Sequence, residues 1–419
     1  MVPNTHPDPK PTGVGSANVA PESLSRKQWR DLAISVYLPT MLSFIGFGAV
    51  IPLIALTAHD LGASTAEAAL VVSLLGIGSL LGALPAGAIT QRFGERRALV
   101  GSLVVDAACM VAAAFATHVL VLAAAVLALG LSGAVLMIAR QSFLTEFIPF
   151  QFRARALSTL GGVFRVGSLL GPLAGAAVVT LFDLRAAYWL AVGTSLAAAA
   201  ISALLPDLPP SAHPDPNEPV GMASVLRAHA KVLLTVGLGA AALMLVRATR
   251  DALLPLWAAE IGLGPAETSL IFAASSAIDL ALFYLGGSMM DRLGRRAVAV
   301  PAMVVMSACF GLLPLTATGL GLTAVAVGLG LGNGISSGVV LTLGSDASPS
   351  IGRTHFLAGW RLVTGIGQAA GPLMVSGLAA VASLSVAAWA VAAVGMVGGA
   401  WLWYWAGPPR TIPTPPGGN

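Results

Sequence analysis

A ten-residue segment between two long apolar runs is the most informative part of this sequence. Residues 287–296 read Gly-Ser-Met-Met-Asp-Arg-Leu-Gly-Arg-Arg. Residues 87–97 read Gly-Ala-Ile-Thr-Gln-Arg-Phe-Gly-Glu-Arg-Arg, so a diverged copy lies 200 positions earlier. Two copies of one segment indicate an internal repeat, and a repeat constrains the whole fold.

The offset of 200 residues aligns further positions along the chain without a gap. Other aligned pairs are Cys109 and Cys309, Gly130 and Gly330, Glu146 and Asp346, Pro149 and Pro349, and Arg153 and Arg353. Chance matches between the abundant Gly and Ala residues do not explain pairs of these rarer types. We therefore predict two parallel halves, residues 33–205 and 231–406, joined by a cytoplasmic linker at 206–230.

The composition indicates a membrane protein. Hydrophobic residues make up 56% of the chain and charged residues 10%, whereas soluble domains carry about 25% charged residues. The mean hydropathy is +0.86, and a membrane-spanning helix needs about 20 mostly apolar residues. The predicted spans are 33–58, 67–90, 98–117, 119–143, 155–181, 186–205, 232–258, 267–290, 297–317, 319–344, 355–383 and 386–406. We predict an all-α integral membrane protein with twelve transmembrane helices.

The basic residues set the expected orientation. Of the 22 Lys and Arg residues, sixteen lie in the tails and the loops on the side of the termini, and five lie within predicted spans. The opposite side holds one, Arg185. Cytoplasmic loops carry the excess of Lys and Arg, so we predict that the tails, residues 1–32 (disordered) and 407–419, are cytoplasmic. The many Ala and Gly residues suggest a bacterial protein, in the cytoplasmic (inner) membrane.

Residues 287–296 resemble the G-x-L-x-D-R-x-G-R-R loop of the major facilitator superfamily (MFS). The resemblance covers nearly the whole chain and implies the MFS fold of a secondary transporter. It also implies that the two loops lock the halves in one state. The predicted gating residues are Gly87, Gln91, Arg92, Gly94, Arg96, Gly287, Asp291, Arg292, Gly294, Arg295 and Arg296. Gln91 and Glu95 depart from the family pattern, because Gln91 replaces an acid and Glu95 a base. The alternative is that these arginines only anchor the topology.

The fifth predicted span carries a second motif, consisting of Gly167, Gly171, Pro172 and Gly175. Glycines four apart let two helices approach closely, and the proline can bend its helix. The motif is similar to the G-x-x-x-G-P-x-x-G pattern of exporters in the superfamily, which favours export. The alternative is generic packing, since Gly367, Gly371 and Pro372 repeat it. Residues 122–129 of the fourth span contain no arginine, although proton-driven drug exporters often carry one there.

Charged residues within predicted spans are the candidate site, because ionisable groups in a membrane are costly and usually functional. Arg247, Arg250 and Asp251 are three and four positions apart, which places them on one helix face. Asp279 lies in the middle of the next span. Arg247 and Asp279 both lie about 17 Å from the outer surface at 1.5 Å per residue, so we predict that they pair. The pair is either static or exchanges with a substrate or proton.

Three further polar residues are candidates to line a cavity between the halves: Arg165, Arg361 and Gln368. Arg361 and Arg140 lie near span ends, so we expect their side chains to extend to the membrane interface. Asp106 lies in the third span, for which the resemblance implies a peripheral position and a structural role.

The predicted function is secondary active transport by alternating access. The sequence has no G-x-x-x-x-G-K-[ST] nucleotide-binding loop, so an ion gradient would supply the energy, with protons carried by Asp279 or Asp251. The favoured form is proton-coupled export of a small organic molecule or drug by a monomer. The alternatives are uptake of an organic anion, lipid flipping, or a sensor that no longer transports. We predict no enzyme activity, cofactor, metal or nucleic-acid partner; the expected partners are substrate, protons and membrane lipid.

Overall fold

The computed structural model describes residues 33–148, 153–204, 222–349 and 352–406. Over these ranges the chain is helical and has no strand. Twelve helical segments there are long and apolar enough to cross a membrane, which confirms the predicted all-α membrane fold. The predicted tails and residues 206–221 of the predicted linker lie outside the described residues.

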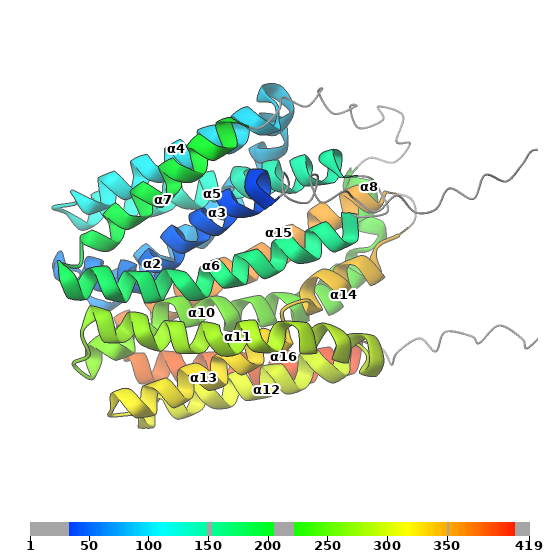
Figure 1. Cartoon of the computed structure of the whole chain (residues 1–419). Coiled ribbons are helices and arrows are strands. Elements are labelled where there is room, and N and C mark those ends of the chain that lie inside the picture. Colours follow the sequence, from blue (N-terminus) through cyan, green and yellow to red (C-terminus); the bar gives the residue numbers. More distant parts are fainter. Residues whose placement is uncertain (1–32, 149–152, 205–221, 350–351, 407–419) are drawn as a thin grey trace, which may run out of the picture.

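Six of the twelve candidate spans lie between Leu38 and Leu181 or in Ala186–Ala203, and six lie between Ala230 and Trp405; they form two groups of helices (Figure 1). The first half contains η1 (Ala33–Tyr37), α2 (Leu38–Asp60), α3 (Thr65–Phe93), α4 (Glu95–Ala114), α5 (Val119–Phe147), α6 (Arg153–Leu181) and α7 (Ala186–Ala203). Two short helices, α8 (Met222–Ala228) and α9 (Ala230–Val232), lead into the second half. It contains η3 (Leu233–Gly237), α10 (Leu238–Glu260), α11 (Pro265–Leu293), α12 (Arg295–Leu312), η4 (Leu313–Leu315), α13 (Gly319–Ile335), α14 (Val339–Ala347), α15 (Arg353–Val381) and α16 (Leu384–Trp405).

The repeat is visible in the helix boundaries themselves. Helices α2, α3 and α6 begin 200 residues before α10, α11 and α15, and the π-helical turn η1 begins 200 residues before η3. Gly62 and Gly262 share a positive φ of 87° and 79°, and Gly94 and Gly294 share one of 80° and 87°. Only glycine adopts this backbone conformation without steric cost. We call the end of the bundle with Gly94, Gly294 and α8 the α8 end, and the other the Gly62 end.

One span departs from both the repeat and the predicted boundaries. The predicted span 319–344 is interrupted at residues 336–338, between α13 and α14, whereas its counterpart α5 is continuous. Ser336 lies at the interruption, and its hydroxyl donates to the Gly332 carbonyl over 2.7 Å. Clustered Gly and Ser residues are a common cause of such kinks. The interruption therefore follows from the local sequence Gly-Asn-Gly-Ile-Ser-Ser-Gly.

Small residues bring neighbouring helices into backbone contact. A Cβ atom added at Gly130 of α5 would lie 2.3 Å from the carbonyl oxygen of Leu75 in α3. A Cβ atom added at Gly171 of α6 would lie 2.6 Å from the carbonyl oxygen of Ile45 in α2. Lipid tails are as apolar as side chains, so membrane helices associate through close packing of this kind. The contact at Gly171 sets the close spacing of α2 and α6, which both line the interface between the halves.

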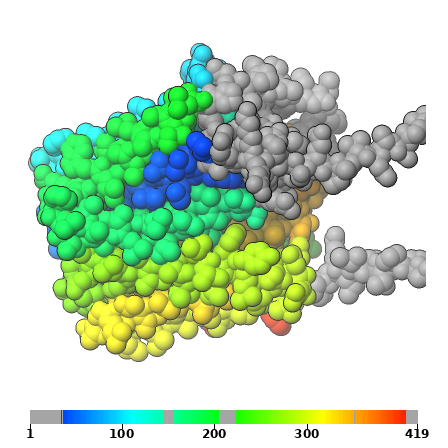
Figure 2. Space-filling model, in the orientation of Figure 1, coloured from blue at the N-terminus to red at the C-terminus, as the bar shows by residue number. Residues whose placement is uncertain are grey.

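The helix pairs that join the halves include α6 with α11, α3 with α15, α2 with α10, α2 with α11 and α3 with α10. Figure 2 shows the first pair on the visible face, with α6 in green-cyan above α11 in yellow-green. At the Gly62 end the halves are in direct contact. The Ser376 hydroxyl donates to the Ala66 carbonyl over 2.8 Å, and Ala259 packs with the cluster of Leu53 and Leu56. The bundle is therefore closed at this end.

Candidate functional site: a charged cavity between the halves

A cavity of about 640 Å³ lies between the two halves, lined by α2 and α6 on one side and by α10, α11, α13 and α14 on the other. Its lining reaches Leu157 and Leu341, which are 37% and 74% exposed and lie towards the α8 end. Towards the Gly62 end, Leu53 and Leu254 are 0% and 1% exposed. The cavity therefore opens at the α8 end and is closed at the other.

An ion pair crosses the cavity from one half to the other. Arg165 of α6 pairs with Asp279 of α11 through its Nη1 atom. The second carboxylate oxygen of Asp279 accepts a hydrogen bond of 2.6 Å from the Nδ2 atom of Asn333 in α13. The side chains of Arg165 and Asp279 are only 16% and 13% exposed. Charge-assisted hydrogen bonds between poorly hydrated groups are strong, so this link joins the halves firmly.

The Asn333 side chain lies between Arg247 and Asp279, which we predicted to be in direct contact. We predicted that Arg247 pairs with Asp279, but the Nε atom of Arg247 donates to the Oδ1 atom of Asn333 over 2.5 Å. The amide thus accepts from Arg247 and donates to Asp279. The prediction was wrong in the partner because it compared the depths of two helices of one half. Depth along those helices does not reveal that Arg165 of the other half reaches the same carboxylate.

Arg250 and Asp251 complete the charged lining. The Nε atom of Arg250 lies 3.5 Å from the Oδ1 atom of Asp251, and its Nη1 atom donates to the Ser275 hydroxyl over 3.4 Å. Its guanidinium also lies 5.7 Å from the centre of the Phe272 ring. All five charged candidates from spans five, seven and eight therefore face one cavity.

Aromatic rings form the rest of the wall. The phenylalanines of the lining are Phe44, Phe47, Phe164, Phe272 and Phe283. Phe44 of α2 and Phe164 of α6 have ring centres 4.5 Å apart. The Arg165 guanidinium lies 4.4 Å from the centre of the Phe283 ring, a distance at which a cation is attracted to the ring face. The cavity thus offers flat apolar surfaces beside fixed charges.

Other predicted residues lie elsewhere. Arg361 and Gln368 are exposed, and neither is among the described residues that line the cavity. Arg361 donates to Gln141 of the first half over 3.1 Å. Arg140 was expected to reach the membrane interface, which is wrong. Its side chain is buried, with the Phe44 and Phe164 rings 5.9 and 5.8 Å from its guanidinium, because these rings offer it a favourable site inside the protein.

The two predicted gating loops make contacts with helices of their own halves. In the second half, Arg295 pairs with Asp346 at the end of α14 over 2.7 Å, and Arg296 lies 3.6 Å from the centre of the Trp403 ring. In the first half, Glu95 is buried and accepts a hydrogen bond from Ser142 of α5 over 3.4 Å. Gln91 and Asp291 are exposed. A locking role for these loops remains a proposal.

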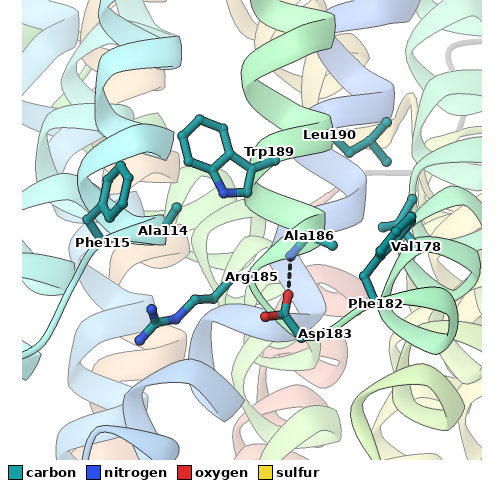
Figure 3. Close-up of a pocket in the computed structure, with 9 residues that line it drawn as sticks. All are labelled: Ala114, Phe115, Val178, Phe182, Asp183, Arg185, Ala186, Trp189 and Leu190. Atoms are coloured by element: carbon teal, nitrogen blue, oxygen red, sulfur yellow. Dashed lines mark hydrogen bonds between the residues drawn. The ribbon is translucent and has the colours of Figure 1, made fainter.

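A second pocket, of about 720 Å³, lies within the first half at the Gly62 end (Figure 3). Figure 3 shows Trp189 beside Phe115, and their ring centres are 5.5 Å apart. Asp183 accepts a hydrogen bond of 2.9 Å from the backbone of Ala186 and so caps the start of α7. Arg185 also lines the pocket. Since this pocket contacts one half only, it does not span the interface as the cavity does.

Comparison with known proteins agrees with the fold. The sequence profile described as Major Facilitator Superfamily matches residues 36–246 and 236–419. The chain belongs to this superfamily. Solved structures with the same fold include a POT family transporter in complex with 5-aminolevulinic acid, with a TM-score of 0.73, 10% identity, and coverage of 90% of this chain and 96% of that one. A D-xylose-proton symporter has a TM-score of 0.70, 15% identity, and coverage of 91% and 98%.

Among curated MFS relatives, Multidrug resistance protein MdtG of Salmonella heidelberg is 25% identical over 169 residues. The match covers 39% of this chain and 42% of MdtG, so the chain spans about two-fifths of the length of that relative. Family membership and the twelve candidate spans make this protein a multi-pass membrane protein of that superfamily. Among the residues that the structure describes, no three side chains gather as a metal site would require.

Proposed function

We propose that this MFS protein exports a small organic molecule in exchange for protons, by alternating access to the cavity between its halves. The observation that carries the proposal is the pairing of Arg165 with Asp279 across the cavity. A carboxylate that holds the two halves together gives proton binding a direct effect on their arrangement. The similarity to a multidrug resistance protein and the glycine–proline motif of α6 favour export.

The proposed cycle uses the ionisation of Asp279. While it is charged, Asp279 holds Arg165 and the halves remain joined at the cavity. When a proton binds to a carboxylate oxygen, the ionic attraction is lost and α6 can separate from α11. Removing one partner of a poorly hydrated ion pair costs about 3–5 kcal/mol, which is enough to shift a two-state equilibrium by more than 100-fold. A proton that binds from the opposite side of the membrane is released on the side to which the described cavity opens, and its release restores the link.

We further propose that the α8 end faces the cytoplasm of a bacterial cell and that the monomer is the transporting unit. The excess of arginine in the loops of that end supports this orientation. With this orientation the described conformation is open to the inside. The loops at residues 87–97 and 287–296 then lie where they can join the halves in the opposite conformation.

The test of this proposal is Asp279→Asn, which keeps the shape of the side chain but cannot gain or lose a proton. We expect inside-out vesicles with the native protein to release protons from their lumen when a transported compound is added. A panel of ethidium, tetraphenylphosphonium and naphthalene-1-sulfonate supplies candidates. In Asp279→Asn we expect at least a tenfold loss of this proton flux, while exchange of labelled compound for unlabelled compound continues.

Asp60→Asn is the matched control, since Asp60 is an exposed carboxylate at the end of α2. Its proton flux should equal that of the native protein. Undiminished proton coupling in Asp279→Asn would remove Asp279 from the mechanism. Transport that is driven into the cell rather than out of it would instead replace export by uptake.

A further inference from the structure

The charges that line the cavity do not balance. Three arginines, Arg165, Arg247 and Arg250, face two aspartates, Asp251 and Asp279, which leaves a net charge of +1 from 3 − 2. Each aspartate is already engaged by an arginine, Asp279 by Arg165 and Asp251 by Arg250. The remaining cation is Arg247. Its hydrogen-bond partner, Asn333, is a neutral amide.

Arg247 also has free hydrogen-bonding capacity. Only its Nε atom is bonded to a residue in the described part of the chain, so its Nη1 and Nη2 atoms remain available in the cavity. Arg250 lies three positions further along α10 and faces the same cavity. A guanidinium binds a carboxylate, sulfonate or phosphate through two parallel hydrogen bonds. The two arginines therefore form a site that suits an anionic group.

The neighbouring surface suits an aromatic ring. Phe44 and Phe164 lie opposite the arginines in the lining, on α2 and α6, and a third ring, Phe47, lies 6.2 Å from Phe44. Aromatic rings pack at such centre-to-centre distances in offset or edge-on arrangements. The volume of about 640 Å³ is typical of sites for drug-sized molecules.

A cationic cargo has no comparable site. A positive group would need a carboxylate, and both carboxylates of the described lining are held by arginines. It would also enter a lining with three arginines and two aspartates, in a region of low hydration where like charges repel strongly. The electrostatics of the cavity thus select against cations.

We propose that the cargo is an organic anion with an aromatic body, whose carboxylate, sulfonate or phosphate binds Arg247 and Arg250 while its rings pack on Phe44 and Phe164. The inference rests on the proposed function only in taking this cavity as the transport site. It differs from the expectation for a multidrug exporter of lipophilic cations.

Three probes with one ring system and different charges test the inference. They are naphthalene-1-sulfonate, 1-naphthalenemethanol and 1-naphthylmethylammonium, and their binding to the purified full-length protein in nanodiscs is measured by equilibrium dialysis. We expect the sulfonate to bind at least tenfold more tightly than the ammonium. Arg247→Gln should weaken the sulfonate at least tenfold and leave the neutral alcohol unchanged. If Arg247→Gln does not fold, Arg250→Gln replaces it and should weaken sulfonate binding in the same way.

Arg185→Gln is the matched control, because Arg185 lines the second pocket beside aromatic residues. It should leave sulfonate binding unchanged. Preference for the ammonium, failure of all three probes to bind, or loss of sulfonate binding in Arg185→Gln rather than Arg247→Gln would overturn the inference. The proposed function and the anionic cargo can fail separately. Proton-coupled export of a cation would support the proposed function and refute the anionic cargo. Arg247-dependent binding of the sulfonate without proton coupling would support the anionic cargo and refute the proposed function.

Discussion

At the scale of single residues, Asn333 has the most unusual position. Its amide oxygen accepts from Arg247 and its amide nitrogen donates to Asp279. An amide side chain offers an acceptor and a donor on separate atoms, which lets it bond to both neighbours at once. Because the Asn333 amide lies between them, Arg247 stays close to the Asp279 carboxylate without forming an ion pair with it.

Replacing Asn333 by Leu should destabilise the protein by about 2 kcal/mol, because it leaves the Nε atom of Arg247 and a carboxylate oxygen of Asp279 without partners. Thermal unfolding of the purified protein in detergent measures the loss. Ser337→Ala is the control, since Ser337 lines the same cavity and its hydroxyl makes no hydrogen bond to a described residue. Equal unfolding temperatures for the two variants would show that the amide bridge does not hold the cavity together.

The sequence identified the charged residues of the cavity but not their pairing. Arg165, Arg247, Arg250, Asp251 and Asp279 stand out because a charge inside an apolar span is costly. Which carboxylate meets which arginine depends on how the halves dock, and helix depth does not contain that information. Asn333 was missed because it carries no charge, although a single amide in a run of Gly and Leu is a recognisable signal.

At the scale of helices, the crossing of α3 and α5 depends on glycine. A Cβ atom at Gly130 would meet the Leu75 carbonyl oxygen at 2.3 Å and the Ser79 nitrogen at 2.9 Å. Both are backbone atoms, which cannot move away as a flexible side chain does. Gly133 is three residues further along the same helix, and a Cβ atom there would meet nothing within 4 Å.

These two glycines provide a matched pair of variants. Gly130→Ala should destabilise the protein by about 2 kcal/mol or more through overpacking, whereas Gly133→Ala should be neutral or slightly stabilising because Ala favours helix. Unfolding temperatures and yields of monodisperse protein measure the contrast. If Gly130→Ala unfolds at the same temperature as Gly133→Ala, then backbone contact does not set this crossing.

The sequence predicted the twelve membrane-spanning helices, but it did not predict the interruption of one of them between α13 and α14. Twelve apolar runs of sufficient length predict twelve spans, because the bilayer fixes how many residues a helix needs. The run 319–344 is apolar enough as a whole to cross a membrane although residues 336–338 are Ser-Ser-Gly, and hydropathy does not report backbone angles. Only the cluster of Gly and Ser near Ser336 signalled the break between α13 and α14.

At the scale of the whole molecule, the two halves meet at the Gly62 end and part towards the α8 end. The repeat at 200 residues predicts two similar halves. It does not predict which end is closed, since each half alone is compatible with either conformation. That choice depends on contacts between halves, such as the hydrogen bond from Ser376 to Ala66.

A cross-link at that contact should arrest transport. With Cys109 and Cys309 replaced by Ser, the pair Ala66→Cys and Ser376→Cys is joined by a short thiosulfonate cross-linker. We expect more than 90% loss of exchange activity, as an order-of-magnitude estimate for a locked two-state equilibrium, and recovery on reduction. The control pair, Ser102→Cys and Ser132→Cys, copies a hydroxyl–carbonyl contact of 2.9 Å inside the first half and should leave activity unchanged. Full activity in the cross-linked Ala66 and Ser376 variant would rule out rocking of the two halves.

The excess positive charge of the cavity has an electrical consequence. A cycle that admits one proton and releases one monovalent anion moves two charges across the membrane in the same electrical sense. At a potential of 100 mV, inside negative, two charges correspond to about 4.6 kcal/mol, whereas exchange of a proton for a monovalent cation moves no net charge. A transporter with this cavity would be driven by voltage as well as by acidity, and would continue to expel its cargo when the pH on both sides is equal.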